Sequence, residues 1–330
     1  MAHTPTKSLT KRNILLGVGG VLIVLAVFIA IQFDAHKPVS GAEGDNGHKL
    51  LASRESLYNN IYVYQVGDYV SMTFGYNRHI YTESIYNTRD ERDLPVEYTR
   101  YMTESLVYPK NIHSILEIGF GGGRTAWYLH KYLPDATVTS VELDPEIVNL
   151  AHQYFGIKDE PNFNVVNEDG RLFLANSKDR YDIILIDAYR GPFVPFHLLT
   201  KEFYQLVKDH LSDGGVMEQN VEPSTMLFDS AVMTVHSIFP NIDFYRAEGN
   251  VAMAAYDGPA RDEADLKKIA AARQAQLQTR FNLEDMLKKR QKYAGNTSPV
   301  DANAKVLTDD FAPVESLKAI EVHNRKWSDP

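Results

Sequence analysis

The stretch "ILEIGFGGGRT", residues 115–125, decides the fold of this chain of 330 residues. An apolar run that leads into clustered glycines and then into a helix-forming segment predicts a strand, a tight turn and a helix. Glycines at such a turn let the backbone approach a ligand closely, and the N–H groups that begin the next helix are free to bind it. The stretch therefore predicts the first strand of an α/β sheet with a nucleotide-like ligand at its carboxyl end.

The alternation of strand, turn and helix extends through residues 113–258, which we assign to one domain. Such alternation predicts a doubly wound parallel sheet, here with seven strands. The predicted strands lie near residue 115 and at 137–143, 163–166, 181–187 and 216–221, and 242–247 and 251–256 are expected to close the far edge. The predicted helices are 125–132, 145–154, 200–211 and 224–239.

Two smaller regions flank this domain. Residues 56–112 begin with a segment rich in Tyr, Val and Ile that is interrupted by Gly-Asp and Gly-Tyr-Asn, which predicts an N-terminal β meander serving as a lid. Residues 259–330 are predicted to form a helical C-terminal extension that closes with an LTDDFAP segment. Within it, residues 261–293 predict two helices, with Asn282 and Asp285 placed like a capping box between them.

Charge and composition exclude several classes of partner. The net charge is 34 − 43 = −9, so we expect no nucleic-acid partner, whose phosphates require clustered Lys and Arg. The chain has no cysteine, which excludes disulfides and thiolate metal sites. His197 and His236 are isolated, without a second ligand three or four residues away, so no metal site is predicted.

Acidic residues after the later strands complete a candidate nucleoside site. Glu142 ends one predicted strand, where its carboxylate could accept both ribose hydroxyls, and Asp169 follows the next strand, where it could reach an adenine amino group. Position 124 is Arg, which breaks the Gly pattern of dinucleotide-binding turns. Taken singly, the turn could be structural and both acids could cap helices. The spacing instead resembles the S-adenosylmethionine loop of the Rossmann-like class I transferase fold, with candidate donor-binding residues Glu117, Gly119, Gly121, Gly122, Gly123, Glu142, Asp169 and Gly170.

A longer stretch of the sequence resembles a known family. The stretch "ILIDAYRGPFVPFHLLTKEFY", residues 184–204, resembles the strand-four region of the spermidine synthase family of aminopropyltransferases. The β meander and "VLTDDFAPVE", residues 306–315, are also similar to that family, in particular to its members attached to membrane segments. The resemblance implies transfer of an aminopropyl group from decarboxylated S-adenosylmethionine to an amine, as in polyamine biosynthesis. It assigns Asp187 the catalytic role of orienting and deprotonating the amine, and it implies a homodimer.

The sequence departs from the family where acidic residues hold the cationic amine. The acid usually found in the glycine loop is Gly122, the second acid after the catalytic Asp is Arg190, and Glu97 is the nearest acid in "LPVEYTRYM". Arg190 could meet an anionic group or face solvent. The candidate acceptor-binding residues are Tyr76, Glu97, Tyr98, Tyr189 and Arg190.

These departures leave alternatives open. With Gly122 in the loop, a donor carboxylate could find space, so ordinary S-adenosylmethionine could bind and the enzyme could transfer a methyl or aminocarboxypropyl group. A catalytically inactive adenosyl-binding module is a further alternative. Asp309 and Asp310 could be a catalytic acid pair, but the residues that follow them favour a helix cap and a turn.

The N-terminus predicts a membrane anchor. Residues 14–33 form an uncharged run of membrane-spanning length after three basic residues, so we expect one transmembrane helix within residues 1–33, in contact with the lipid bilayer, followed by a tether at 34–55. A cleaved signal is the alternative. The predicted localisation is therefore single-pass in a membrane. The charge rule favours an extracytoplasmic domain, whereas adenosyl donors are made inside the cell, so the side remains open.

Overall fold

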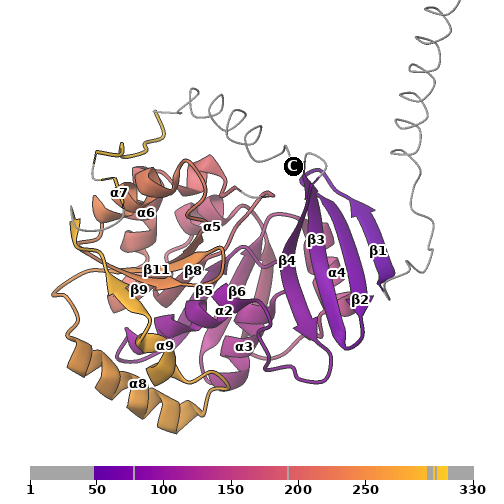
Figure 1. Cartoon of the computed structure of the whole chain (residues 1–330), viewed down its shortest axis with the longest axis horizontal. Coiled ribbons are helices and arrows are strands. Elements are labelled where there is room, and N and C mark those ends of the chain that lie inside the picture. The colour runs from indigo at the N-terminus through magenta and orange to yellow at the C-terminus, as the bar shows by residue number, and fades with distance from the viewer. Residues whose placement is uncertain (1–47, 77–78, 192, 296–299, 302, 311–330) are drawn as a thin grey trace, which may run out of the picture. The chain divides into compact units, whose positions relative to one another are not determined.

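The computed structural model describes residues 48–310 apart from 77–78, 192, 296–299 and 302. Within this part, four strands come first along the chain, an α/β sheet follows, and two helices precede its last edge strand (Figure 1). The last three residues of the LTDDFAP segment, 311–313, and everything after them lie outside the described residues.

The predicted membrane localisation is corrected by the structure. Among the residues that the structure describes, no helix is long and apolar enough to cross a membrane. This finding overturns the single-pass localisation. The run 14–33 on which that prediction depended lies outside the described residues, as do the tail before it and the tether up to residue 47.

The N-terminal strands form an antiparallel meander in the order β1-β2-β3-β4. Alternate residues on β2 and β3 are buried, Ile61 and Val63 on the first and Val70, Met72 and Phe74 on the second, so one face of the sheet packs on the core. The meander starts seven residues earlier than the predicted lid. Its strands are β1 (Lys49–Glu55), β2 (Asn60–Val66), β3 (Tyr69–Tyr76) and β4 (His79–Asn87).

The large sheet has eight described strands in the order β12-β10-β11-β9-β8-β5-β6-β7. Strands β7, β6, β5, β8 and β9 are parallel to one another. The strands are β5 (Ser114–Ile118), β6 (Thr137–Glu142), β7 (Phe163–Asn167), β8 (Tyr181–Ile186), β9 (Leu211–Val221), β10 (Asn241–Arg246), β11 (Val251–Tyr256) and β12 (Arg290–Lys292).

The far edge of this sheet differs from the prediction of seven parallel strands. Strands β10 and β11 are joined by a short turn, and β11 pairs antiparallel with both β10 and β9. A parallel pair needs a long crossover connection, which a turn of this length cannot supply. β12 adds an antiparallel edge strand where helix was predicted, because Arg290 pairs at 2.7 Å with the buried Asp243 of β10. The sheet is therefore mixed.

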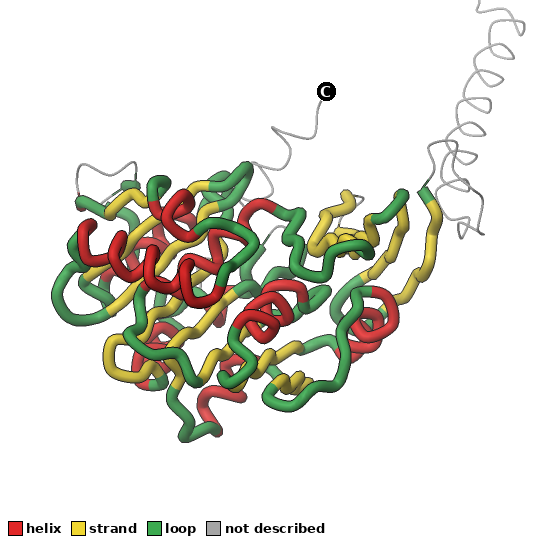
Figure 2. Tube along the Cα trace, turned by 90° about the horizontal axis from the view of Figure 1, so that it is seen from below, coloured by secondary structure: helices red, strands yellow, loops and turns green. Residues whose placement is uncertain are grey.

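Helices cover both faces of the sheet, as the red and yellow segments of Figure 2 show. Alternate residues of β8 belong to two core clusters: Ile183 and Leu185 to one, Ile184 and Ile186 to the other. The helices are α2 (Glu97–Met102), η1 (Thr103–Val107), α3 (Arg124–Tyr132), α4 (Pro145–Tyr154), α5 (Gly170–Asn176), η2 (Phe196–Leu198), α6 (Lys201–Asp209), α7 (Phe228–His236), α8 (Glu263–Leu277) and α9 (Leu283–Leu287).

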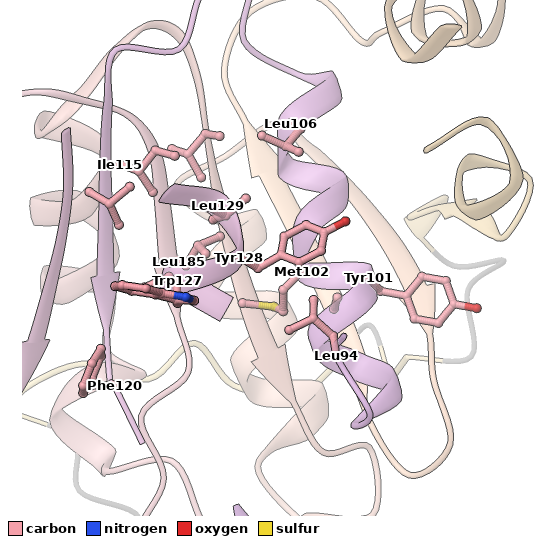
Figure 3. Close-up of a cluster of buried hydrophobic side chains, with 14 of the residues drawn as sticks. Leu94, Tyr101, Met102, Leu106, Ile115, Phe120, Trp127, Tyr128, Leu129 and Leu185 are labelled. Carbon is pink, nitrogen blue, oxygen red and sulfur yellow. The ribbon is translucent and has the colours of Figure 1, made fainter. Parts of the chain in front are cut away.

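The first of these clusters fixes α2, a short helix that the sequence did not predict. Met102 of α2 and Leu106 of η1 are fully buried and lie with Trp127 and Leu129 of α3 against the sheet (Figure 3). A six-residue helix is too short to be stable alone, so this packing, rather than helix propensity, holds α2 in place.

Candidate active site

A cavity of about 810 Å³ opens at the carboxyl ends of the parallel strands. The ends of β5, β6 and β8 contribute to its wall, and so do β4 of the N-terminal sheet and α2. Ligands of open α/β sheets bind at this edge of the sheet. Among the residues that the structure describes, no group of three or more His, Cys, Asp or Glu could hold a metal ion.

The glycine turn after β5 brings that strand close to Asp187. Gly119 has φ of 92°, and a Cβ on it would lie 2.3 Å from the backbone oxygen of Asp187, so only glycine fits. Gly119 and Gly121 line the cavity.

The loop glycine that replaces the family's acid is enclosed by other side chains. A Cβ on Gly122 would lie 2.6 Å from the ring of Phe155 and 2.8 Å from Cβ of Ser84, and the Gly122 N–H donates to Oγ of Ser84 at 2.9 Å. A side chain at position 122 would therefore require Phe155 or Ser84 to move. Gly122 and Gly123 do not line the cavity, and their assignment as donor contacts stays a prediction.

Glu142 holds the glycine turn in place. Its Oε2 accepts hydrogen bonds from the N–H groups of Phe120 at 2.9 Å and Gly121 at 3.3 Å, and its Oε1 accepts from Asp144 N–H at 3.0 Å. Burial raises the pKa of Glu142, and these three N–H groups oppose that shift. The residue lines the cavity at the end of β6, as predicted for a ribose-binding acid.

Glu117 lies under the same turn. Its Oε2 accepts a hydrogen bond from the Ser140 hydroxyl at 2.7 Å, and only 2% of the residue is exposed. Burial raises the pKa of Glu117 to about 8, so the side chain is largely protonated at neutral pH.

Asp169 begins α5 and also borders the cavity. Its Oδ1 accepts from the N–H groups of Arg171 and Leu172, both at 3.0 Å, and its Oδ2 lies 3.0 Å from Nε2 of His197. Asp169 is thus a helix cap that still lines the cavity, so both roles that the sequence allowed are compatible. A Cβ on Gly170 would lie 2.3 Å from Cγ2 of Ile118, so this glycine lets α5 pack against β5.

Asp187 is held from two sides where β8 ends. Its Oδ2 accepts a hydrogen bond from the Tyr98 hydroxyl at 3.0 Å, and its Oδ1 accepts from Nδ2 of Asn220 at 2.8 Å. Asn250 in turn donates to Oδ1 of Asn220 at 3.0 Å, which orients the amide. Burial raises the pKa of Asp187, and the bonds from Asn220 and Tyr98 counteract part of this rise.

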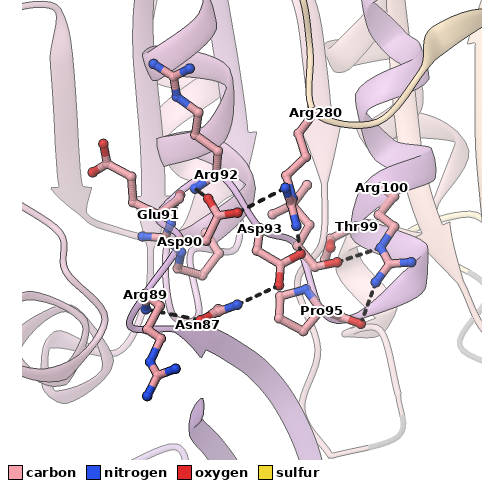
Figure 4. A network of polar contacts seen from close by, with 12 residues as sticks. Asn87, Arg89, Asp90, Glu91, Arg92, Asp93, Pro95, Thr99, Arg100 and Arg280 are labelled. Atoms are coloured by element: carbon pink, nitrogen blue, oxygen red, sulfur yellow. Dashed lines mark hydrogen bonds and ion pairs between the residues drawn. The ribbon is translucent and has the colours of Figure 1, made fainter. Parts of the chain in front are cut away.

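The loop before α2 positions Tyr98. Arg280, between α8 and α9, pairs with Asp90 at 3.0 Å and Asp93 at 3.6 Å, and Asn87 at the end of β4 donates to Asp93 at 3.0 Å (Figure 4). Arg100 of α2 donates to the backbone oxygen of Leu94 at 2.6 Å. These contacts tie the end of the N-terminal sheet to the helix that carries Tyr98.

The remaining acceptor candidates differ in position. Tyr189 lines the cavity and donates to the backbone oxygen of Asn220 at 3.0 Å. Arg190 is exposed at the edge of the cavity. Of the two environments predicted for it, an anionic group or solvent, the structure shows solvent. Glu97 is exposed, accepts from Glu248 N–H at 2.8 Å and is absent from the cavity wall. Tyr76 ends β3, but its side chain lies outside the described part of the chain.

Sequence reasoning missed two residues of the site. Asn220, near the end of β9, has no recognisable motif around it. Glu83 of β4 lines the cavity, and burial, followed by the charges of Asp187 and Glu222, raises its pKa to about 8. The available signal was that Glu83 is the one acid in the β4 sequence HIYTESIYN.

The parallel strand order, the glycine turn and the carboxyl groups at the strand ends define a Rossmann-like fold of the methyltransferase type. Two solved structures share it. A probable spermidine synthase from Corynebacterium glutamicum matches with a TM-score of 0.61 and 18% identity over 79% of this chain and 97% of that chain. A spermidine synthase crystallised with the transition state analogue AdoDATO matches with a TM-score of 0.57 and 20% identity over 73% of this chain and 83% of that chain.

Sequence comparison gives the family. The spermine/spermidine synthase domain matches residues 97–247. A polyamine aminopropyltransferase of Chromobacterium violaceum is 30% identical over 215 residues, which cover 62% of this chain and 81% of the relative. A probable polyamine aminopropyl transferase of Bifidobacterium longum is 30% identical over 287 residues, 81% of this chain but only 62% of that longer relative.

The chain belongs to the spermine/spermidine synthase family of polyamine aminopropyltransferases. This confirms the family resemblance and the transferase class, and it supports aminopropyl transfer in polyamine biosynthesis as the function. The comparisons do not show that the chain belongs to the membrane-attached subgroup of this family.

Proposed function

We propose that the protein transfers an aminopropyl group from decarboxylated S-adenosylmethionine to an amine, with Asp187 as the catalytic base. The observation that carries this proposal is the position of Asp187: it lies at the end of β8, beside the glycine turn, with both carboxyl oxygens oriented by Tyr98 and Asn220.

The cavity is of a suitable size for the donor. Its volume of about 810 Å³ lies within the range of small-molecule sites, roughly 300–1,000 Å³. Glu142 and Asp169 would hold the ribose and the adenine, and Gly119 and Gly121 would let the backbone pass close to the donor. The AdoDATO complex of a spermidine synthase with the same fold supports a donor of this kind.

The chemistry requires alignment and one proton transfer. The amine nitrogen attacks the methylene carbon bonded to the sulfonium, a C–N bond forms, and the C–S bond breaks with its electron pair on sulfur. Methylthioadenosine leaves as a neutral thioether, and the proton of the attacking nitrogen passes to Asp187. Because the sulfonium is already activated, most of the rate enhancement would come from holding the two substrates in line. Burial raises the pKa of Asp187, which favours its accepting the proton.

Product analysis by mass spectrometry tests the proposal. The full chain is incubated with decarboxylated or ordinary S-adenosylmethionine and a panel of amines. We expect methylthioadenosine and an aminopropylated amine from the decarboxylated donor. S-adenosylhomocysteine from the ordinary donor would establish a methyltransferase instead, and donor binding without any product would establish an inactive adenosyl-binding module. Homodimerisation stays a prediction, which sedimentation of the same sample would test.

A further inference from the structure

Three carboxyl groups surround one part of the cavity. Asp187 from β8, Glu83 from β4 and Glu222 from the segment after β9 are close enough for their charges to act together on the Tyr189 hydroxyl. Glu83 lines the main cavity, and Glu222 lines a small adjoining hollow that shares Tyr189 and Leu227 with it. The three acids therefore line both the main cavity and the adjoining hollow.

Glu83 is the member of this group with a buried carboxyl oxygen that has no hydrogen-bond partner among the described residues. Its Oε1 is buried and accepts no hydrogen bond from the residues that the structure describes. By contrast, Asp187 is bonded by Tyr98 and Asn220, and Glu222 accepts from the hydroxyl of Ser224. A buried carboxyl oxygen without a donor is unfavourable unless a ligand satisfies it.

No neighbouring basic side chain offers that donor within the described part of the site. Arg190 is exposed at the rim. Arg124 also lines the cavity, but its guanidinium donates to the backbone oxygens of Phe155 and Glu91 and lies over the ring of Tyr86. A charged donor for Glu83 would therefore come with a substrate, whose positive charge would favour the ionised form of this carboxyl group.

The charges that act on Glu83 differ from those that act on the acids of the donor site. Asp187 and Glu222 are the charged groups that raise its pKa, whereas Asp187 and Glu142 are the ones that act on Glu117 under the glycine turn. Asp187 is thus close both to the acids of the donor site and to Glu83.

We infer that Glu83 binds the ammonium group of the acceptor amine and determines acceptor specificity. Glu83, on the N-terminal sheet, would thereby take the role of the family's second acid, whose position after β8 is occupied by Arg190. The inference rests on the proposed aminopropyl transfer. Its physical basis is the charge-assisted hydrogen bond that an ammonium group would donate to the unpaired Oε1.

Steady-state kinetics of Glu83→Gln, which keeps the side-chain shape and removes the charge, test the inference. Release of methylthioadenosine by the full chain is measured with 1,4-diaminobutane and with 1-aminobutane, which lacks the second ammonium. We expect the KM for 1,4-diaminobutane to rise at least about tenfold, the size of one hydrogen bond to a charged group. The KM for the donor should stay within about twofold, and the preference for the diamine should fall by the same factor as its KM rises.

The matched control is Glu55→Gln, which removes an exposed acid from β1 of the same sheet. It should leave both KM values unchanged, and Glu83→Asp should restore part of the diamine preference. An unchanged diamine KM in Glu83→Gln, or a rise confined to the donor KM, would overturn the inference.

A binding measurement separates this inference from the proposed reaction. The affinity for 1,4-diaminobutane is measured by calorimetry with methylthioadenosine present, for wild type, Glu83→Gln and Glu55→Gln. Weaker binding in Glu83→Gln alone supports the role of Glu83 even if the wild type shows no turnover, in which case only the proposed reaction fails. Equal binding in all three proteins contradicts the role of Glu83.

Discussion

Two regions of the molecule contain buried carboxyl groups, and they differ in what surrounds them. In the cavity, Asp187 and Glu83 face a space large enough for a ligand. In the core, Glu104 of η1 and Glu218 of β9 are fully buried and line neither cavity described above. Burial raises the pKa in both regions. A raised pKa therefore does not identify a site; access to a ligand does.

The two regions also differ in their hydrogen bonds. Asp187 accepts one bond on each oxygen, which fixes its direction. Glu104 has no partner on either oxygen among the described residues, so a protonated, uncharged side chain is its stable form. We expect the cavity acids to control turnover and the core acids to control stability.

The largest expected effect is that of Asp187→Asn. Removing the base while keeping the shape of the side chain should lower kcat by about 10²–10⁴. Thermal unfolding and methylthioadenosine binding should stay close to wild type, because the amide is nearly isosteric. Asp213→Asn, an exposed residue of β9, is the control. Wild-type kcat in Asp187→Asn would remove the basis for treating the cavity acid as catalytic.

The next effect is on stability and concerns Glu104→Gln. In the unfolded chain, Glu104 loses its proton above about pH 4.5, whereas in the folded protein its raised pKa keeps it protonated. The contribution of Glu104 to stability is therefore greatest at low pH and falls as the pH rises. The free energy of unfolding of wild type should therefore decrease from pH 5 to pH 8. In Glu104→Gln this decrease should be shallower by up to about 1.4 kcal/mol per pH unit.

Denaturant unfolding across this pH range gives the two slopes. Glu83, Glu117 and Glu218 are present in both proteins, so the difference between the slopes reports Glu104 together with the effect of its charge on Glu218. Turnover should not change. Equal slopes would show that Glu104 is ionised in the fold, and the contrast between core and cavity acids would then be wrong.

A smaller effect is expected for Tyr98→Phe. It removes one hydrogen bond from Asp187, worth about 1 to 1.5 kcal/mol, so kcat/KM should fall by roughly 5- to 13-fold. Because this bond lowers the pKa of Asp187, its loss should also move the acid limb of the pH profile of kcat/KM to higher pH. Tyr101→Phe on the same helix is the control. A fall in kcat/KM without movement of the acid limb would mean that Tyr98 acts only by packing.

The smallest effect concerns an acid that belongs to neither region. Asp309 pairs with Arg171 at the start of α5, and 41% of its side chain is exposed. Asp309→Asn should reduce the free energy of unfolding by at most about 1 kcal/mol, less in high salt, without changing turnover. A large loss of turnover would revive the catalytic acid pair that "LTDD" allowed in the sequence.

The errors in the predicted fold have identifiable causes. The far edge of the sheet became antiparallel because a short turn joins β10 and β11, and β12 formed because Asp243 needs Arg290 as its partner. Phe155 and Ser84, which come from other elements, enclose the Cβ position of Gly122. None of these contacts is visible in local periodicity.

The sequence by itself determined the alternation of strands and helices from residue 113 onward, the glycine turn, and the place of Asp187 at a strand end. Each depends on residues close together in the chain, and parallel strands then bring their carboxyl ends to one edge. Only the tertiary structure decided that Glu83, Tyr98 and Asn220 meet around Asp187. They come from the N-terminal sheet, α2 and β9, and packing and ion pairs between distant segments, rather than any local pattern, bring them together.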